Sequence, residues 1–430
     1  MSLHPIFNIK NGELYVENVR VMDLVEKYGT PLHVISSNRI KQKYGELYSA
    51  STEYWKNTLI CYAYKANPTL AILKLLHGLG AGAEVVSAGE LYAARLIGVK
   101  HDKIVFNGVS KSPSELSDAI SVQVGLLNIE SLTELKLIND IASKLNIQVN
   151  LGVRINFDVP VRTHRYISTG MKFHKFGLGV NEAFEAYKLA LKSKRIRVRG
   201  IHVHIGSQIL TVYPFVKASN NMVSFAEKLY ETLKLRLDLI DLGGGLGIQY
   251  SLEDKTFSSQ EYCKNVFPII TEKIGTIFDD ESIIILEPGR YLVGDAGILL
   301  TRVNYVKQIG DIKWVLVDAG MNDLIRPALY DALHRIVVVN KFDLPSVERY
   351  SVSGPICESA DVFVRDYPLP KVDIGDILAI LDTGAYGISM SSQYNCRPRA
   401  PIVMVEGEDV KLIRRRETYA DIFMCDLNYR

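Results

Sequence analysis

The chain has 430 residues, of which 47% are hydrophobic and 23% are charged, and its formal net charge is +2. This composition is typical of globular proteins, and the length exceeds what a single hydrophobic core usually serves, so two domains are expected. The nearly balanced charge gives no electrostatic case for binding nucleic acid or an anionic membrane. No apolar run approaches the roughly 20 residues that a membrane-spanning helix needs, so no membrane partner is expected.

Cysteine usage bears on the compartment and on metal binding. The five cysteines lie at positions 61, 263, 357, 396 and 425, and their spacing does not match a metal site. Residues 1–11 lack the apolar core of a signal peptide. We therefore expect a cytoplasmic protein without a bound metal.

Apolar runs and helical runs alternate from residue 59 to residue 287. The expected strands are 59–63, 82–86, 103–106, 125–128, 148–155, 198–204, 238–242 and 282–286, and the expected helices are 68–78, 88–97, 112–121, 131–144, 181–193, 215–234 and 259–276. Ser112-Pro113 and Ser131, each with a glutamate three residues after the serine, are typical helix starts. Eight alternating strands over about 230 residues predict a TIM barrel, with a doubly wound open sheet as the alternative.

The two ends of the chain show a different pattern. Short strand-like runs separated by turn residues occupy 14–16 and 32–35, and then 298–306, 314–317, 336–339, 377–380 and 402–405. We predict an α/β protein in which residues 37–290 form the barrel and residues 291–430 form an antiparallel β domain. Residues 1–36 are expected to add strands to that β domain.

Polar residues follow most of the predicted barrel strands. They include Lys65, Glu84, Asn107, Arg154, His202, His204, Ser207, the glycines 243–245, Glu287 and Arg290. Because the active site of a TIM barrel lies at the C-terminal ends of its strands, these side chains are expected to share one rim.

Lys65 is the strongest single candidate on this rim. It lies just after the first strand, where burial lowers the pKa of an ammonium group and frees the amine to form a Schiff base. A solvated loop lysine is the alternative reading of this position alone.

Three further features point to pyridoxal phosphate. Gly243-Gly244-Gly245 follows the seventh strand, where backbone N–H groups can approach a phosphate, although a tight turn is the alternative. His202 and His204 are two residues apart on a predicted strand and are expected to share a face, from which one imidazole could stack on a flat ring. The alternatives are a packed core histidine or a metal site, although no third ligand at a suitable spacing is evident. Glu287 could pair with the ring nitrogen of this cofactor, or form a salt bridge with Arg290.

Beyond the barrel, polar residues cluster in loops between strands, at 318–330, 354–361, 382–387 and 394–399. Cys357 and Glu358 are adjacent in one of these loops and could form an acid–base pair. The alternative for a lone cysteine is a small buried hydrophobic residue.

Together these segments resemble those of the diaminopimelate decarboxylases, which are pyridoxal phosphate enzymes with the fold of alanine racemase. The resemblance covers nearly the whole chain, from residues 62–67 to residues 415–417. The lysine segment and the glycine loop are shared with ornithine and arginine decarboxylases. The segments more specific to the diaminopimelate branch are 166–170 with 175–177, 204–208, 321–323 with 326–327, and 356–359.

The resemblance implies roles for individual residues. Lys65 would form the Schiff base with pyridoxal 5'-phosphate, His204 would stack on the ring, and Glu287 would pair with the ring nitrogen. The other residues expected around the cofactor are Glu84, Arg154, Ser207, Gly243, Gly244, Gly245, Gly289, Arg290 and Tyr386. The residues expected to bind the distal end of the substrate are Arg290, Arg326, Tyr330, Glu358 and Tyr386.

The same resemblance implies the reaction and the assembly. Meso-2,6-diaminopimelate would be converted to L-lysine and CO2, the last step of lysine biosynthesis. Cys357 would protonate the carbanion left when CO2 departs. In this family the loop with Cys357 and Glu358 enters the partner subunit's active site, so a homodimer with shared active sites is implied. Cys396 departs from the family, whose members usually carry a small residue there, such as serine.

Two alternatives stay open. A decarboxylase of ornithine or arginine would share the fold, but two arginines at the distal end would oppose substrates that end in cations. A non-catalytic pyridoxal phosphate-binding protein would not need Cys357, Glu358 and Tyr386, which are all present.

Overall fold

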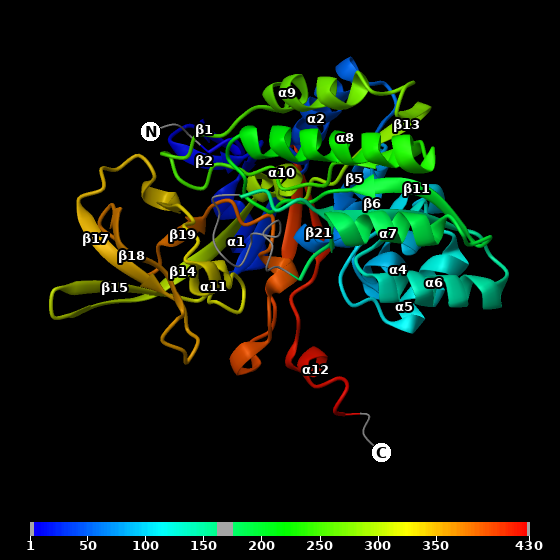
Figure 1. Cartoon of the computed structure of the whole chain (residues 1–430). Helices are drawn as coiled ribbons and strands as arrows, with labels where there is room; N and C mark the ends of the chain where they lie inside the picture. Colours follow the sequence, from blue (N-terminus) through cyan, green and yellow to red (C-terminus); the bar gives the residue numbers. More distant parts are fainter. Residues whose placement is uncertain (1–3, 161–174, 428–430) are drawn as a thin grey trace. The chain divides into compact units, whose positions relative to one another are not determined.

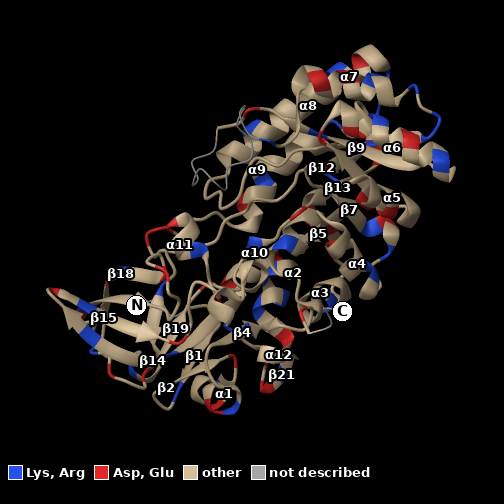
Figure 2. Ribbon diagram, turned by 90° about the horizontal axis from the view of Figure 1, so that it is seen from below, with Lys and Arg blue, Asp and Glu red and all other residues tan. Residues whose placement is uncertain are grey.

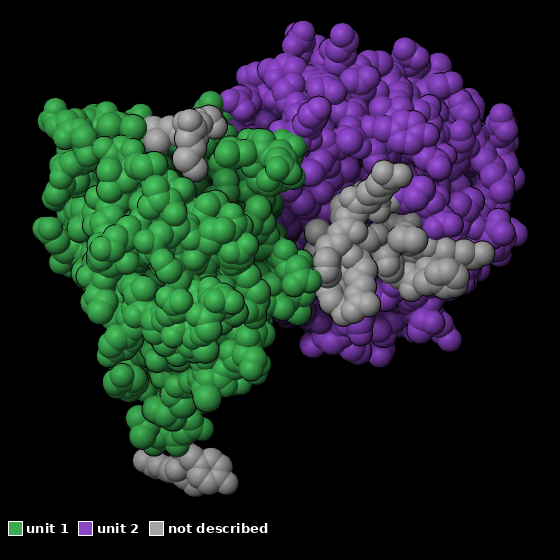
Figure 3. Space-filling model, turned by 90° about the vertical axis from the view of Figure 1, so that its left-hand side faces the viewer, with its two compact units in different colours: residues 1–42, 249–254, 292–430 green, residues 43–248, 255–291 purple. Residues whose placement is uncertain are grey.

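The structure is a computed structural model that describes residues 4–160 and 175–427. Segment 166–170, which the family resemblance singled out, lies outside the described residues. The chain divides into two compact units, coloured green and purple in Figure 3. Unit 1 comprises residues 1–42, 249–254 and 292–430, and unit 2 comprises residues 43–248 and 255–291. Segment 249–254 falls inside the span expected for the barrel, yet it groups with unit 1.

Unit 2 is a closed parallel barrel. Its eight strands pair in the ring β9-β11-β12-β13-β5-β6-β7-β8, which the pairing of β8 with β9 closes. The open-sheet alternative is therefore excluded, and the predicted TIM barrel is confirmed. The strands are β5 (Thr58–Ala63), β6 (Gly82–Val85), β7 (Ile104–Phe106), β8 (Leu126–Ile129), β9 (Val149–Asn156), β11 (Ile196–His202), β12 (Leu237–Asp241) and β13 (Phe278–Leu286).

Helices cover the outside of these strands (Figure 1). They are α3 (Leu70–Gly78), α4 (Ala88–Leu96), α5 (Pro113–Val122), α6 (Leu132–Leu145), α7 (Val180–Ala190), α8 (Tyr213–Leu233) and α9 (Ser259–Thr271). The predicted helix starts are present. The Ser112 side chain accepts the Glu115 N–H, and the Glu115 carboxylate accepts the Ser112 N–H in return. Ser131 caps α6 through the Glu134 N–H, whereas the Glu134 carboxylate accepts the N–H of Glu130.

The barrel interior is closed by close packing around Leu126. Leu126 clusters with the buried residues Cys61, Val105, Leu239 and Ile285. A Cβ atom added at Gly200 would lie 2.7 Å from Leu126 Cδ1, so neighbouring strands leave room for the leucine by carrying glycine. Burial raises the pKa of the Cys61 thiol well above its usual range, so this cysteine is an inert part of the core.

Unit 1 is built on a nine-stranded sheet. The main path is β18-β17-β15-β14-β4-β20-β21, and β16 and β19 attach through the pairing of β19 with β14. The strands are β4 (Leu32–Ser36), β14 (Gly297–Ile309), β15 (Ile312–Val317), β16 (Ile336–Val338), β17 (Glu348–Ser353), β18 (Val362–Leu369), β19 (Ile377–Ile380), β20 (Ile402–Glu406) and β21 (Asp409–Arg414). The N-terminal strand β4 lies between β14 and β20. Most pairings are antiparallel, as predicted, but β4 with β20 and β15 with β17 are parallel.

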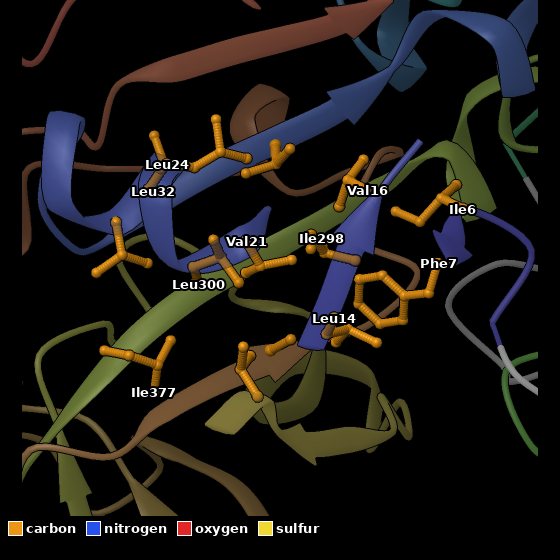
Figure 4. Close-up of a cluster of buried hydrophobic side chains, with 14 of the residues drawn as sticks. Ile6, Phe7, Leu14, Val16, Val21, Leu24, Leu32, Ile298, Leu300 and Ile377 are labelled. Carbon is orange, nitrogen blue, oxygen red and sulfur yellow. The ribbon is translucent and has the colours of Figure 1, made fainter. Parts of the chain in front are cut away.

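The remaining N-terminal strands differ from the prediction. β1 (Phe7–Lys10), β2 (Glu13–Val16) and β3 (Val19–Arg20) form a separate three-stranded sheet, followed by helix α1 (Val21–Tyr28). Their apolar side chains pack on the large sheet, as Figure 4 shows. On β14 the side chains alternate between two cores, because successive residues of a strand point to opposite faces. Ile298 and Leu300 belong to the first core and Leu299 to the second.

Charged residues of both signs are interspersed on α6 and α7 (Figure 2), in keeping with the balanced composition. Within the described part of the chain, no helix is long and apolar enough to cross a membrane.

Candidate active site

The rim of the barrel in unit 2 holds a continuous polar network that starts at Lys65. This lysine lies in the 3-10 turn η1 (Tyr64–Ala66), directly after β5. Its Nζ atom is 2.8 Å from Glu84 Oε2 at the end of β6. The lysine side chain is 37% exposed while the glutamate is fully buried, so the amine reaches the rim with its charge partner beneath it. The ion pair with a buried carboxylate favours a site role for Lys65 over a solvated loop lysine.

Asn107 links this ion pair to Glu287. The Asn107 Nδ2 atom donates to Glu84 Oε1 at 3.1 Å and to Glu287 Oε1 at 2.6 Å. Its Oδ1 atom accepts a hydrogen bond of 2.8 Å from Asn128. Asn107 follows β7, so one amide group joins two carboxylates that stand at the ends of different strands.

Glu287 is a buried carboxylate in contact with two other ionisable side chains. His202 Nε2 lies 3.4 Å from Glu287 Oε2, an electrostatic contact without hydrogen-bond geometry. Burial opposes ionisation of Glu287, but the favourable charges of His202 and Lys65 outweigh it and lower the pKa of Glu287 below its usual range. Burial and the Glu287 carboxylate raise the pKa of Asp241 well above its usual range. The pair therefore holds one proton, on Asp241, and Glu287 stays ionised.

His202 and His204 have different surroundings, which corrects the prediction that they share a strand face. The strand ends at His202, and His204 lies in the loop beyond it. The Gly244 N–H donates to His204 Nδ1 at 3.2 Å, which requires the ring to be unprotonated at that nitrogen. Burial, helped by Arg154 and Lys65, lowers the pKa of His204 well below its usual range, so this imidazole is neutral and flat.

The glycine loop after β12 is pressed against its neighbours. Gly243 has φ +66°, and a Cβ atom there would lie 2.4 Å from Val203 O. A Cβ atom at Gly244 would lie 2.1 Å from Glu287 O. Side chains are thus excluded where the loop meets the strand ends that carry His204 and Glu287, and backbone N–H groups can approach an anion there.

The loop after β13 completes the rim. Arg290 Nη2 donates to Ser207 Oγ at 3.1 Å. A Cβ atom at Gly289 would lie 3.0 Å from Ala66 Cβ, so this loop packs against the turn that carries Lys65. Arg154, at the end of β9, pairs with Glu130 Oε1 at 3.0 Å and lies over the ring of Phe176.

The remaining predicted site residues lie in unit 1. Arg326 and Tyr330 begin and end the short helix α11 (Arg326–Tyr330). Cys357 and Glu358 are exposed, and the Cys357 N–H donates to Asn395 Oδ1 at 2.7 Å. The exposure of Cys357 contradicts the alternative of a small buried hydrophobic residue. Tyr386 has φ +58°, a left-handed conformation.

The sequence assigned no role to Asn107, Asn128 and Asp241 of the rim. It also assigned none to Tyr250 and His334, which contact Arg326 in unit 1. The position of Asn107 after a predicted strand was a usable signal, and Asp241 lies within a predicted strand. No local pattern indicated that Tyr250 or His334 would contact Arg326, because those contacts join distant segments.

Among the described residues, His202, Asp241 and Glu287 place ligand atoms within 4.8 Å of one another, close enough for a metal ion. The protonation states of Glu287 and His204 fit an organic cofactor equally well. An ionised carboxylate beside a neutral imidazole and a glycine loop matches the ring nitrogen, the ring face and the phosphate of pyridoxal phosphate.

Comparison with known proteins identifies the class. Residues 42–294 match the family model described as the pyridoxal binding domain of pyridoxal-dependent decarboxylases. The chain belongs to this family, and the fold and the cofactor chemistry follow from that membership.

The similarity extends beyond the barrel. Over 97% of its length the chain is 43% identical to diaminopimelate decarboxylase from Aquifex aeolicus, of which 96% is covered. It is also 43% identical to the Methanocaldococcus jannaschii enzyme of that name, with the same coverage. A crystal structure of the M. jannaschii enzyme in complex with L-lysine superposes with a TM-score of 0.92 at 41% identity, covering 98% of both chains.

Proposed function

We propose that this protein is a pyridoxal phosphate-dependent carboxy-lyase that converts meso-2,6-diaminopimelate to L-lysine and CO2. The observation that carries the proposal is the network that joins Lys65 through Glu84 and Asn107 to an ionised Glu287. The similarity to diaminopimelate decarboxylases over the full length of the chain supports the choice of substrate.

The rim residues of unit 2 fit the cofactor. Lys65 Nζ is the proposed point of covalent attachment, and the Gly243–Gly245 loop with Ser207 and Arg290 would hold the phosphate. Tyr386 is proposed to contribute to the same phosphate site. When bound, pyridoxal phosphate supplies a ring that accepts the electron pair left by the departing CO2.

Glu287 and His204 would tune this chemistry. The Glu287 carboxylate would keep a proton on the ring nitrogen, because its low pKa keeps it charged and Asn107 holds one of its oxygens. The neutral His204 ring would cover one face of the cofactor, oriented by the Gly244 N–H. Glu84 would keep the Lys65 amine at the rim, and Arg154 would add positive charge beside His204.

Specificity depends on the distal end of the substrate, which carries a second amino-acid head. We propose that Arg290, Arg326 and Tyr330 bind its carboxylate, that Glu358 binds its ammonium group, and that Tyr386 assists. A lysine or ornithine substrate lacks the distal carboxylate and would leave arginines without their partner, which costs roughly 1–3 kcal/mol.

The exposed Cys357 is the proposed proton donor to the carbanion, acting in the partner subunit's active site within a homodimer. Exposure of the Cys357–Glu358 loop is compatible with such an exchange. The five cysteines are all free, and on this ground we also propose a cytoplasmic location.

The experiment combines spectroscopy with product detection. The purified protein should show the visible absorption of bound pyridoxal phosphate and should release CO2 from meso-diaminopimelate. Lys65→Ala should lose both signals, and Lys56→Ala, on the short connection between α2 (Ser37–Tyr54) and β5, is the matched control that should keep both. CO2 release from ornithine or arginine instead would assign another decarboxylase, and cofactor binding without CO2 release from any of these would indicate a non-catalytic protein.

A further inference from the structure

We propose that His334 is a positioning residue that orients Arg326 for the distal carboxylate of the substrate and thereby contributes to substrate selection. The inference rests on the proposed function, in which Arg326 binds that carboxylate. It concerns a buried cluster of three side chains in unit 1, formed by Arg326, His334 and Tyr250.

The imidazole of His334 bridges Arg326 to the backbone. Arg326 Nη1 lies 2.7 Å from His334 Nε2, and His334 Nδ1 lies 2.7 Å from the carbonyl oxygen of Leu381. Both His334 and Arg326 are buried, at 0% and 4% exposure.

The partners decide where the proton of the ring lies. A carbonyl oxygen can only accept, so Nδ1 must carry the hydrogen that bonds to Leu381. A guanidinium group can only donate, so Nε2 must offer its lone pair to Arg326. His334 therefore acts as a neutral acceptor, and it fixes one edge of the guanidinium group without cancelling its positive charge.

Tyr250 fixes the face of the same group. Arg326 Cζ lies 4.5 Å from the centroid of the Tyr250 ring. The Tyr250 and His334 rings meet edge to face, with centroids 5.1 Å apart and an interplanar angle of 70°. One aromatic face and one imidazole edge together define the plane of the guanidinium group.

A fixed plane matters because arginine binds a carboxylate through two parallel N–H donors. Orienting that fork before the substrate arrives removes part of the entropy cost of binding. Loss of the His334 acceptor should therefore weaken ligands that carry the distal carboxylate more than ligands that lack it.

Two polar substitutions separate the two hydrogen bonds of His334. The amide of His334→Asn can reach the Leu381 carbonyl, as Nδ1 does, but is too short to reach Arg326. The longer side chain of His334→Gln can place its amide oxygen near the position of Nε2. The matched control for stability is Val405→Ala, which opens a cavity in the buried β20 of the same unit without touching the cluster.

The measurements are the steady-state constants for meso-diaminopimelate and the dissociation constants of two ligands. L-lysine, when bound as the product, retains the amino-acid head at the distal end, although as a substrate it would present that head to the reacting centre. By contrast, 1,5-diaminopentane has no carboxylate. We expect His334→Asn to raise KM and the L-lysine dissociation constant about tenfold, with kcat reduced less than about threefold. Binding of 1,5-diaminopentane should change less than about twofold, and His334→Gln should recover most of the L-lysine affinity.

The outcomes separate this inference from the proposed function. If the wild-type protein releases no CO2 from meso-diaminopimelate, the proposed function fails. If the wild type is active but His334→Asn binds L-lysine as the wild type does, only the positioning role fails. Equal weakening of both ligands, or the same pattern in Val405→Ala, would show a general structural role and would also overturn the inference. If His334→Asn does not fold, the test uses His334→Gln, which keeps an acceptor near Arg326. L-lysine affinity equal to that of the wild type then supports the role of the acceptor. If His334→Gln binds L-lysine more weakly but binds 1,5-diaminopentane as the wild type does, the acceptor argument is refuted.

Discussion

Replacing Asn107 by leucine tests whether the network on the barrel rim is held by this one amide. Leucine has the same number and branching of heavy atoms as asparagine, although it is larger, and it cannot form a hydrogen bond. The Glu84 and Glu287 carboxylates, buried at 0% and 3% exposure, would each lose the donor that Asn107 supplies.

The expected cost follows from these two bonds and from the bond that Asn107 Oδ1 accepts from Asn128. A hydrogen bond to a charged group contributes about 1.5–3 kcal/mol and a neutral one about 1 kcal/mol, so losing all three costs about 4–7 kcal/mol. Burial of the more apolar leucine side chain stabilises the folded state by about 1–2 kcal/mol and offsets part of this cost. We therefore expect Asn107→Leu to lower the free energy of unfolding of the barrel unit by about 2–6 kcal/mol.

The two tryptophans of the chain allow the barrel to be followed separately. Trp55 lies in unit 2, where its Nε1 atom donates to Ser282 O, and Trp314 lies in unit 1. In a Trp314→Phe background, urea unfolding followed by fluorescence reports on the surroundings of Trp55.

The matched control is Asn220→Leu, since Asn220 is exposed on α8 and its side chain donates to the carbonyl oxygen of Val216 within the same helix. Its unfolding free energy should change by less than about 0.5 kcal/mol. A loss below about 0.5 kcal/mol for Asn107→Leu would refute the reasoning, because it would mean that both carboxylates find other donors at no cost.

Three further predictions concern the proposed chemistry and its pH dependence. Arg326→Ala should weaken transition-state binding of meso-diaminopimelate by about 2–4 kcal/mol, measured as kcat/KM, and an unchanged preference for this substrate over lysine would exclude the role. Cys357→Ala should slow product formation about 10²–10⁴-fold while the cofactor stays bound, and mixing it with Lys65→Ala should restore some activity because one site of a mixed dimer keeps both groups. No recovery after verified subunit exchange would contradict the shared site. Burial and the neighbouring Glu84 raise the pKa of Glu90 from 4.5 to about 7, so the stability that this group contributes is present below pH 4.5 and is lost as the pH rises through about 7. Between about pH 5 and about pH 8, the free energy of unfolding of Glu90→Gln, followed by Trp55 fluorescence, should therefore rise by about 3 kcal/mol relative to that of the wild type. If the free energies of the two proteins change in parallel with pH, the raised pKa of Glu90 is refuted.

The sequence by itself determined the order of strands and helices in the barrel. Apolar runs of four to eight residues, helix caps such as Ser112 with Glu115, and glycines between them are local signals, and the structure reproduces the elements with ends shifted by a few residues. Because parallel strands in a barrel all end at one rim, the same reading placed Lys65, Glu84 and Glu287 together.

The N-terminal and C-terminal strands were harder to predict. β17, β18 and β21 were missed because charged and polar residues interrupt their apolar residues, so that no clear apolar run marks them. The insertion of β4 between β14 and β20 depends on pairing across more than 250 residues of chain, which no local pattern records.

Only the tertiary structure decided which protons and hydrogen bonds the site uses. Asn107, His334 and Asp241 look ordinary in the sequence, and their roles arise from contacts between segments far apart in the chain. The ionised Glu287 and the neutral His204 depend on burial and on charges a few ångströms away, which are set when the strand ends converge. Residue types and their order are local information, whereas protonation and orientation are properties of the environment that folding creates.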